Sequence, residues 1–320
     1  MNEMLEQIYG LGVIPVIAIQ DAAKAVPLAQ GLAAGGLPAA EITFRTAAGE
    51  KAIRQIAQNC PEVLVGAGTI LNTDQCARAI AAGARFIVSP GYIQEVVDYC
   101  LERNVTILPG CITASDMTRA ANCGLEVVKF FPAEQSGGLG FIKALAQVFP
   151  KLKFMPTGGI NADNLNSYLA FDRIVACGGS WMVKSDLIAA GRFEEISALA
   201  RQAIQTMLGF ELRHVGVNCA DEAEAEKTAK AFSALFGFAY KPGNSSIFAG
   251  TAVECMKQPF LGDKGHIAIG TNHMDRAIYH LGLQGIYFDE STRKVDDKGH
   301  TKAIYLKDQF AGFAVHLVQK

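Results

Sequence analysis

The residues best suited to chemistry in the first two-thirds of the chain are a lysine and a glutamate with apolar neighbours. Lys129 lies in the run Val127-Val128-Lys129-Phe130-Phe131-Pro132, and Glu41 begins the run Glu41-Ile42-Thr43-Phe44-Arg45. A neutral lysine amine can attack a ketone, and the resulting iminium accepts the electrons of a breaking carbon–carbon bond. A neighbouring carboxylate can carry the protons that such a reaction moves. This pair therefore fits Schiff-base chemistry.

Histidine is unevenly distributed along the chain. All six histidines lie beyond residue 210: His214, His266, His273, His280, His300 and His316. Acid–base chemistry in the first two-thirds must then use Glu, Asp, Lys, Tyr or Cys. The distribution also predicts two domains, residues 1–210 and 211–320, which meet near Gly209–Leu212. No Gly/Ser-rich or Pro-rich stretch occurs there, so we expect a short connection.

The first domain alternates apolar runs with amphipathic stretches, which is typical of parallel β/α units. The expected strands are 13–19, 40–44, 63–67, 86–89, 105–109, 127–131, 153–156 and 174–177. The expected helices include 22–34, 47–59, 73–82, 93–103, 114–123 and 141–148. About eight units in about 210 residues predict a compact α/β TIM barrel. A doubly wound nucleotide-binding sheet would need a glycine fingerprint that Gln20-Asp21-Ala22 does not provide.

Polar and glycine residues follow several of these predicted strands, where a TIM barrel places its active site. Strand alternation predicts that Glu41, Thr43 and Arg45 share one strand face. Glycine-containing loops are expected at 66–69, 156–159 and 177–180, the last two where TIM barrels commonly bind phosphate. Each feature alone has an ordinary structural explanation, such as an ion pair or a turn. Their joint placement after successive strands indicates a site.

These segments resemble the 2-keto-3-deoxy-6-phosphogluconate (KDPG) and 4-hydroxy-2-oxoglutarate (KHG) aldolases of bacteria, in the same order over residues 10–208. The matching segments are Ile14-Pro15-Val16-Ile17, Glu41-Ile42-Thr43-Phe44-Arg45-Thr46, Gly66-Ala67-Gly68-Thr69-Ile70-Leu71, Ser89-Pro90-Gly91, Lys129-Phe130-Phe131-Pro132-Ala133-Glu134, Pro156-Thr157-Gly158-Gly159-Ile160 and Gly178-Gly179-Ser180-Trp181. The resemblance implies a class I aldolase that needs no cofactor, binds a small 2-keto acid and forms a homo-oligomer, usually a trimer.

The same resemblance implies a role for individual residues. Lys129 would form the Schiff base, and Glu41 would transfer protons. Arg45 and Thr69 would contact the substrate carboxylate, and Thr157 would influence stereochemistry at C4. The remaining implied substrate contacts are Pro90 and Phe131, together with Gly158, Gly159, Gly179 and Ser180 at the distal or phosphate end.

Several activities fit this pattern. The leading expectation is cleavage of KDPG to pyruvate and glyceraldehyde 3-phosphate. The alternatives are cleavage of 4-hydroxy-2-oxoglutarate to pyruvate and glyoxylate, or of the phosphogalactonate epimer. A phosphate-binding TIM-barrel isomerase would use carboxylates without an imine.

Residues 212–320 look like two copies of one βαβββ unit in an α+β domain. The copies open at His214-Val215-Gly216-Val217 and His266-Ile267-Ala268-Ile269, and close at 252–256 and 314–318. Helices are expected at 222–235 and 274–281, each ended by a glycine, Gly237 and Gly282.

This repeat resembles the glyoxalase/vicinal oxygen chelate superfamily, which implies His214, Glu254, His266 and His316 as ligands of a divalent metal. That superfamily usually has Glu at the position of His316. The domain is expected to bind metal or to serve as a structural or assembly module, and its two units to pair within one chain or between chains.

Composition limits the class of protein. The 320 residues carry a formal net charge of −2, which gives no electrostatic basis for binding nucleic acid or an anionic membrane. The acidic N-terminus lacks the basic region of a signal peptide, and the apolar run 13–19 is too short to cross a bilayer. Eight scattered cysteines without a Cys-x-x-Cys motif indicate buried thiols in a reducing cytoplasm.

Overall fold

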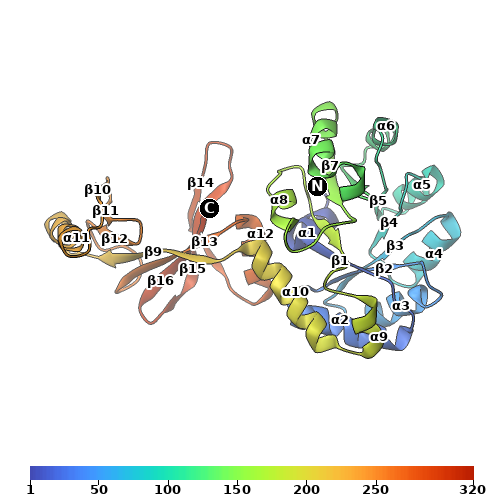
Figure 1. Ribbon diagram of the computed structural model, residues 1–320, viewed down its shortest axis with the longest axis horizontal. Coiled ribbons are helices and arrows are strands. Elements are labelled where there is room, and N and C mark those ends of the chain that lie inside the picture. The colour runs from blue at the N-terminus through green and yellow to red at the C-terminus, as the bar shows by residue number, and fades with distance from the viewer. The chain divides into compact units, whose positions relative to one another are not determined.

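Eight short parallel strands surround a common interior in the N-terminal unit of the computed structural model, which describes residues 1–320 (Figure 1). They are β1 (Val13–Ile17), β2 (Ala39–Thr43), β3 (Leu64–Gly68), β4 (Phe86–Val88), β5 (Thr106–Leu108), β6 (Val127–Phe130), β7 (Lys153–Pro156) and β8 (Cys177–Gly179). Six of them pair in the order β5-β4-β3-β2-β1-β8, and β6 pairs with β7. Single bridges from Gly110 to Lys129 and from Thr157 to Gly178 close the ring, so this unit is TIM-barrel-like.

Helices cover the outside of this ring (Figure 1). They are α1 (Glu3–Leu11), η1 (Ala22–Lys24), α2 (Ala25–Ala34), α3 (Gly49–Asn59), α4 (Thr73–Ala81), α5 (Gln94–Glu102), α6 (Ala114–Asn122), η2 (Glu134–Ser136), α7 (Gly138–Val148), α8 (Leu165–Leu169), α9 (Ser185–Ala190) and α10 (Phe193–Leu208). Every residue of β1, β2 and β3 is buried, as expected for parallel strands with both faces covered. On α3, Ala52, Ile53 and Ile56 form the buried stripe that packs inward.

Three details of the predicted strand ends are wrong. Strand β2 ends at Thr43, so Arg45 lies in the following turn and does not share the strand face of Glu41. Gly66 and Gly68 lie inside β3, and Gly178 and Gly179 lie inside β8, rather than in loops. Ladder pairing overrides the glycine signal here, because Gly178 and Gly179 pair with Ile14 and Pro15 of β1.

The second compact unit, Leu208–Lys320, is built on one eight-stranded sheet. Its elements are β9 (Glu211–Asn218), α11 (Glu222–Phe236), β10 (Tyr240–Pro242), β11 (Ser246–Ala249), β12 (Val253–Met256), β13 (Gly265–Thr271), α12 (Met274–Leu283), β14 (Phe288–Val295), β15 (Thr301–Phe310) and β16 (Phe313–Gln319). The strand order is β10-β11-β12-β9-β13-β16-β15-β14. Strand β9 is parallel to β12, β13 is parallel to β16, and the antiparallel pair β9–β13 joins the two halves within one chain.

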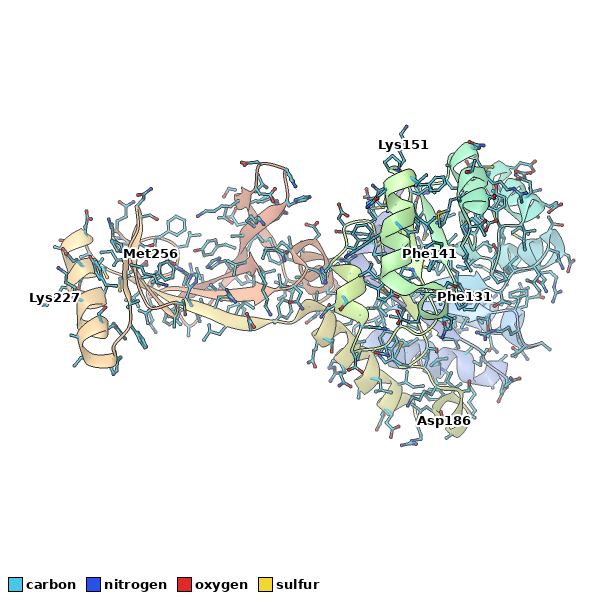
Figure 2. All side chains as sticks on the ribbon, turned by 45° about the horizontal axis from the view of Figure 1, so that its top comes forward. Phe131, Phe141, Lys151, Asp186, Lys227 and Met256 are labelled. Carbon is cyan, nitrogen blue, oxygen red and sulfur yellow. The ribbon has the colours of Figure 1, made fainter.

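The helices of this unit begin close to the predicted positions, but one predicted end is wrong. Gly237 caps α11 with a positive φ of 71°, as expected for a helix-ending glycine. Gly282 lies inside α12, which continues to Leu283, and Gly285 adopts the positive φ instead. Met256 of β12 lies at the sheet, whereas Lys227 of α11 points away from it (Figure 2).

Two features of the whole chain bear on function. All eight cysteines are free thiols, and seven of them are buried. No helix is both long enough and apolar enough to cross a bilayer.

Candidate functional site

Lys129 and Glu41 meet inside the barrel. Lys129 lies on β6 and Glu41 on β2, and the Lys129 Nζ atom is 3.3 Å from Glu41 Oε1. Lys129 is 5% exposed and Glu41 is fully buried. The Phe131 ring lies 5.3 Å from the ammonium group, so an aromatic face adjoins the amine. An amine and a carboxylate in contact inside a protein can exchange a proton directly.

A glycine makes room for the Glu41 carboxylate. A Cβ atom on Gly68 of β3 would lie 2.1 Å from Glu41 Oε1 and 2.8 Å from its Cγ and Cδ atoms. No side chain other than hydrogen can occupy that position without moving Glu41. The second carboxylate oxygen, Oε2, is buried and has no hydrogen-bond partner. A buried acceptor without a partner is costly, which indicates that a ligand or a water molecule completes the site.

A second unpaired polar atom belongs to Thr157, the residue that follows β7. Its Oγ1 atom is buried without a hydrogen-bond partner, and the whole residue is 6% exposed. A Cβ atom on Gly178 would lie 2.3 Å from that oxygen, so glycine is again what admits the polar group. The Thr157 backbone forms a β-bridge with Gly178 of β8, so the ends of β7 and β8 lie side by side.

The other predicted contacts lie at the same ends of the strands. Arg45 is exposed in the turn after β2, and Thr69, with a positive φ of 59°, follows β3. The two strands are neighbours, since Thr43 pairs with Gly68. Pro90 follows β4 and is half-buried, and Phe131 follows β6 and is 36% exposed.

The residues predicted for the distal end follow β7 or lie in and after β8. Gly158 and Gly159 have positive φ angles of 97° and 81°, which only glycine adopts freely, and Gly179 is buried while Ser180 is exposed. Beside Gly159 lies Glu134, whose carboxylate accepts a hydrogen bond from the Tyr168 hydroxyl. Burial raises the pKa of Tyr168, so its hydroxyl remains a donor.

A family model for KDPG and KHG aldolases matches residues 5–199 of this chain. The chain belongs to this aldolase family. The matched segment includes Lys129, Glu41 and every substrate contact predicted for the barrel, and it ends before the second unit begins.

Curated relatives of the aldolase match the barrel over nearly their whole length. The 2-dehydro-3-deoxy-phosphogluconate aldolase of Treponema pallidum is 46% identical over 205 residues, which is 64% of this chain and 98% of that protein. The KHG/KDPG aldolase of Escherichia coli is 42% identical over 193 residues, which is 60% of this chain and 91% of that protein.

A solved structure covers the same part of the aldolase. KDPG aldolase from Legionella pneumophila, with pyruvate captured as a covalent carbinolamine intermediate, is 36% identical with a TM-score of 0.60. The match covers 62% of this chain and 97% of that chain.

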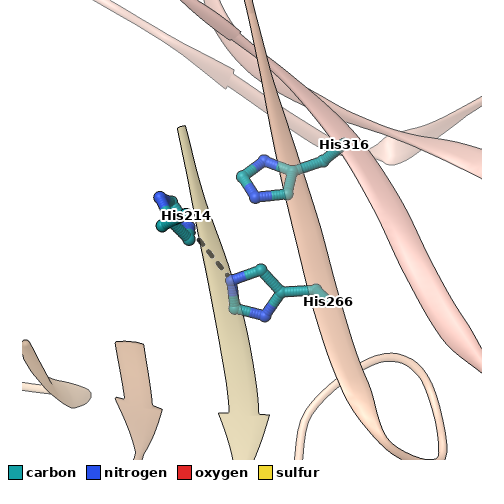
Figure 3. A group of neighbouring side chains, drawn as sticks. All are labelled: His214, His266 and His316. Atoms are coloured by element: carbon teal, nitrogen blue, oxygen red, sulfur yellow. Dashed lines mark hydrogen bonds between the residues drawn. The ribbon is translucent and has the colours of Figure 1, made fainter. Parts of the chain in front are cut away.

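In the second unit, four neighbouring strands direct one polar residue each to a common point. His214, Glu254, His266 and His316 come from β9, β12, β13 and β16, which are adjacent in the sheet. The three imidazoles face one another (Figure 3), and one nitrogen of each lies within 4.8 Å of the others. Glu254 Oε2 is 3.0 Å from His214 Nε2 and 3.1 Å from His266 Nε2.

Hydrogen bonding does not satisfy this cluster. The Nε2 atoms of His214 and His266 are 3.2 Å apart, and both lie within hydrogen-bonding distance of Glu254 Oε2. If both nitrogens donate a proton to that oxygen, their two N–H groups lie side by side and repel each other. Both ring nitrogens of His316 are buried and have no hydrogen-bond partner. Burial first, and then the neighbouring imidazoles, lowers the pKa of His316 to about 3, which leaves the ring neutral with a free lone pair.

The Glu254 carboxylate is held ionised. Burial alone would raise its pKa, but hydrogen bonds from His214, His266 and Ser246 outweigh that effect and hold the pKa well below its usual range. Ser246 Oγ donates to Oε1 at 2.6 Å. A carboxylate oxygen and imidazole nitrogens at these distances are suitable metal ligands.

Sequence reasoning missed several of these supporting residues. A Cβ atom on Gly216 would lie 2.0 Å from the His266 ring, so this glycine of β9 admits the imidazole. Tyr305 stacks on His316 with ring centroids 4.5 Å apart. Neither Gly216 nor Tyr305, nor Gly68 in the barrel, carries a local signal, because each role depends on a partner strand.

Proposed function

We propose that the chain is a class I aldolase that cleaves KDPG to pyruvate and glyceraldehyde 3-phosphate through a Schiff base on Lys129. The observation that carries this proposal is the buried contact of 3.3 Å between Lys129 Nζ and Glu41 Oε1. The names of the relatives from Treponema pallidum and Escherichia coli support the substrate class.

The reaction begins when the neutral Lys129 amine attacks C2 of the keto acid to form a carbinolamine. Loss of the C2 oxygen as water requires a proton donor, and Glu41 is the carboxyl group in contact with the amine. The product is an iminium at C2, which can accept the electron pair of the C3–C4 bond.

Cleavage then needs a base at the C4 hydroxyl. Glu41 takes the hydroxyl proton, the C3–C4 bond breaks, and the electron pair moves into the iminium to give an enamine and a free aldehyde. Protonation at C3 and hydrolysis release pyruvate and the Lys129 amine. In this scheme, the unpaired Glu41 Oε2 and Thr157 Oγ1 atoms provide hydrogen-bonding positions for the substrate oxygens.

The remaining predicted residues bind the other parts of the substrate in this proposal. Arg45 and Thr69 bind the substrate carboxylate, Pro90 and Phe131 contact the substrate, and Thr157 influences stereochemistry at C4. The backbone around Gly158, Gly159, Gly179 and Ser180 takes the phosphate, because backbone N–H groups at the ends of strands can form an anion-binding concavity. We also propose a homo-oligomer, a trimer by family resemblance, which sedimentation of the purified chain tests.

Covalent trapping tests the Schiff base. Incubation with pyruvate and borohydride should add one reduced pyruvyl group at Lys129, and Lys129→Ala should abolish the adduct while the protein remains folded. Lys153, also at a strand of the barrel, offers a matched control, Lys153→Ala, that should still be trapped. An adduct on another lysine, or no adduct, would contradict the mechanism and favour an isomerase without an imine.

A second candidate substrate is 4-hydroxy-2-oxoglutarate, because the Escherichia coli relative is named for both activities. Its cleavage gives pyruvate and glyoxylate and uses the same lysine. Pyruvate release from KDPG, the phosphogalactonate epimer and 4-hydroxy-2-oxoglutarate, compared as kcat/KM, ranks the three substrates.

For the second unit we propose a duplicated βαβββ fold of the glyoxalase/vicinal oxygen chelate class that binds one divalent metal. The supporting observation is the triangle of Glu254 Oε2, His214 Nε2 and His266 Nε2, with sides of 3.0, 3.1 and 3.2 Å. Ligand atoms around a divalent ion at about 2.1 Å lie roughly 3.0–3.4 Å apart. His316 would supply a further nitrogen, and a bound ion would supply Lewis acidity.

Three imidazoles and one carboxylate suit Zn²⁺, Ni²⁺, Co²⁺ or Fe²⁺ better than Mg²⁺ or Ca²⁺. The full chain grown with these metals should carry about one ion, and His266→Ala should lose it. His300→Ala is the matched control, because His300 is exposed in the β14–β15 turn. A metal-free chain that also shows no binding by calorimetry would leave the structural or assembly role.

A further inference from the structure

A cavity opens directly over the histidine cluster in the second unit. It has a volume of about 430 Å³, and His214, Glu254, His266 and His316 form part of its wall. Small-molecule sites commonly measure about 300–1,000 Å³. The cavity is therefore large enough for an organic molecule beside a bound metal ion.

The charges around the cavity favour an anion. Glu254 is the one acidic residue in its wall, and both of its oxygens are already engaged, Oε1 by Ser246 and Oε2 by two imidazoles. Lys294 of β14 is the one lysine or arginine in the wall, and its side chain is exposed. With a divalent ion in place, the cavity would carry a net positive charge.

The uncharged wall has two kinds of surface. Aromatic rings lie next to the cluster. The ring centroids of Phe248 and His214 are 5.4 Å apart, and the Tyr305 ring stacks on His316. Ser245 and Gln258 also line the cavity and are exposed, so they offer hydroxyl and amide groups at its edge. Aromatic faces beside neutral hydrogen-bonding groups suit a molecule that has both C–H faces and hydroxyl groups.

We infer that this cavity binds a sugar acid of about six carbons, whose carboxylate is held between the metal and Lys294 and whose hydroxyl groups meet Ser245 and Gln258. The inference rests on the metal site proposed above. The substrate proposed for the barrel is also a sugar acid, so both units of the chain would serve one class of molecule.

Calorimetry with D-gluconate and D-sorbitol tests the inference, because sorbitol has six carbons and the hydroxyl groups but lacks the carboxylate. The full chain loaded with one equivalent of Ni²⁺ should bind gluconate at least about tenfold more tightly than sorbitol. Lys294→Met should weaken gluconate binding by about tenfold or more. Lys298→Met, in the same hairpin but outside the cavity, should bind as the wild type does.

The possible outcomes distinguish failure of the sugar-acid inference from failure of the metal-site proposal. Nickel binding with equal affinities for gluconate and sorbitol, or an unchanged affinity in Lys294→Met, would overturn the sugar-acid inference and leave the metal site intact. Failure to bind nickel at all would overturn the metal proposal itself. Gluconate binding that survives chelation and the His266→Ala change would show that the acid binds elsewhere, which also overturns the inference.

Discussion

Replacing Gly68 by alanine should uncouple Glu41 from Lys129 without removing either group. The added Cβ atom would lie 2.1 Å from Glu41 Oε1, whereas ordinary contacts of this kind exceed 3.4 Å. Glu41 is fully buried, so its carboxylate must shift by roughly 1 Å inside the barrel, which alters its contact with Lys129. A displacement of about 1 Å in a catalytic group can cost about a hundredfold in rate.

We therefore expect kcat/KM for KDPG cleavage to fall about a hundredfold in Gly68→Ala, which corresponds to about 2.7 kcal/mol of transition-state stabilisation. Coupled detection of pyruvate measures the rate, and thermal unfolding checks that the barrel is intact. Gly140→Ala is the matched control, because a Cβ atom on Gly140 of α7 meets nothing within 4 Å. Its activity should equal that of the wild type.

Glu41→Gln provides a second variant that does not alter packing. It should lower turnover by about two to four orders of magnitude, the usual contribution of a general acid–base group. Near-normal rates in a folded Gly68→Ala protein, together with a large loss in Glu41→Gln, would show that the position of the carboxylate tolerates displacement. Near-normal rates in both variants would refute the role of Glu41.

Two further predictions concern metal and pH. Cleavage of KDPG should survive exhaustive chelation, because the iminium is the electron sink; loss with EDTA that a divalent ion restores would indicate a metal-enolate aldolase. Burial, and then the charge of Arg276, lowers the pKa of His273 from 6.5 to about 4. Below about pH 6.5, His273 therefore binds a proton in the unfolded chain but stays neutral in the folded chain until the pH approaches 4. The free energy of unfolding of the second unit should thus decrease by at most about 2 kcal/mol between pH 7 and pH 5 from this residue. In urea unfolding, His273→Leu should remove that part of the pH dependence, and an unchanged dependence would assign it to other groups.

Local patterns predicted most barrel elements but not all their ends. Helix starts such as Thr73 and Ala114 follow capping residues, Asn72 and Thr113, whose side chains accept from the backbone of the first turn. The predicted ends of β3 and β8 failed because glycine usually signals a turn. In this fold, glycines 66, 68, 178 and 179 lie in strands and leave space for neighbouring side chains.

The contact between Lys129 and Glu41 could not be derived from spacing. Lys129 and Glu41 are 88 residues apart and lie on β6 and β2, strands that are not neighbours in the ring. Only barrel closure brings them together, and local sequence contains no measure of closure. The family motifs identified Lys129 and Glu41 in the sequence, but only the three-dimensional structure shows that the two side chains are in contact. The same holds for Gly216, whose missing side chain matters only because His266 pairs opposite it.

The two units handle buried polar groups differently, and that difference supports different chemistry in each. In the barrel, the buried amine and carboxylate largely compensate each other, and the remaining unpaired atoms are single oxygens of Glu41 and Thr157. In the second unit, one carboxylate contacts two imidazoles, and both nitrogens of a third, His316, remain unpaired. Burying unpaired polar atoms costs about 1–3 kcal/mol each, and a bound group that satisfies them removes this cost. In the functions proposed above, a substrate completes the barrel site, whereas a divalent cation completes the histidine cluster.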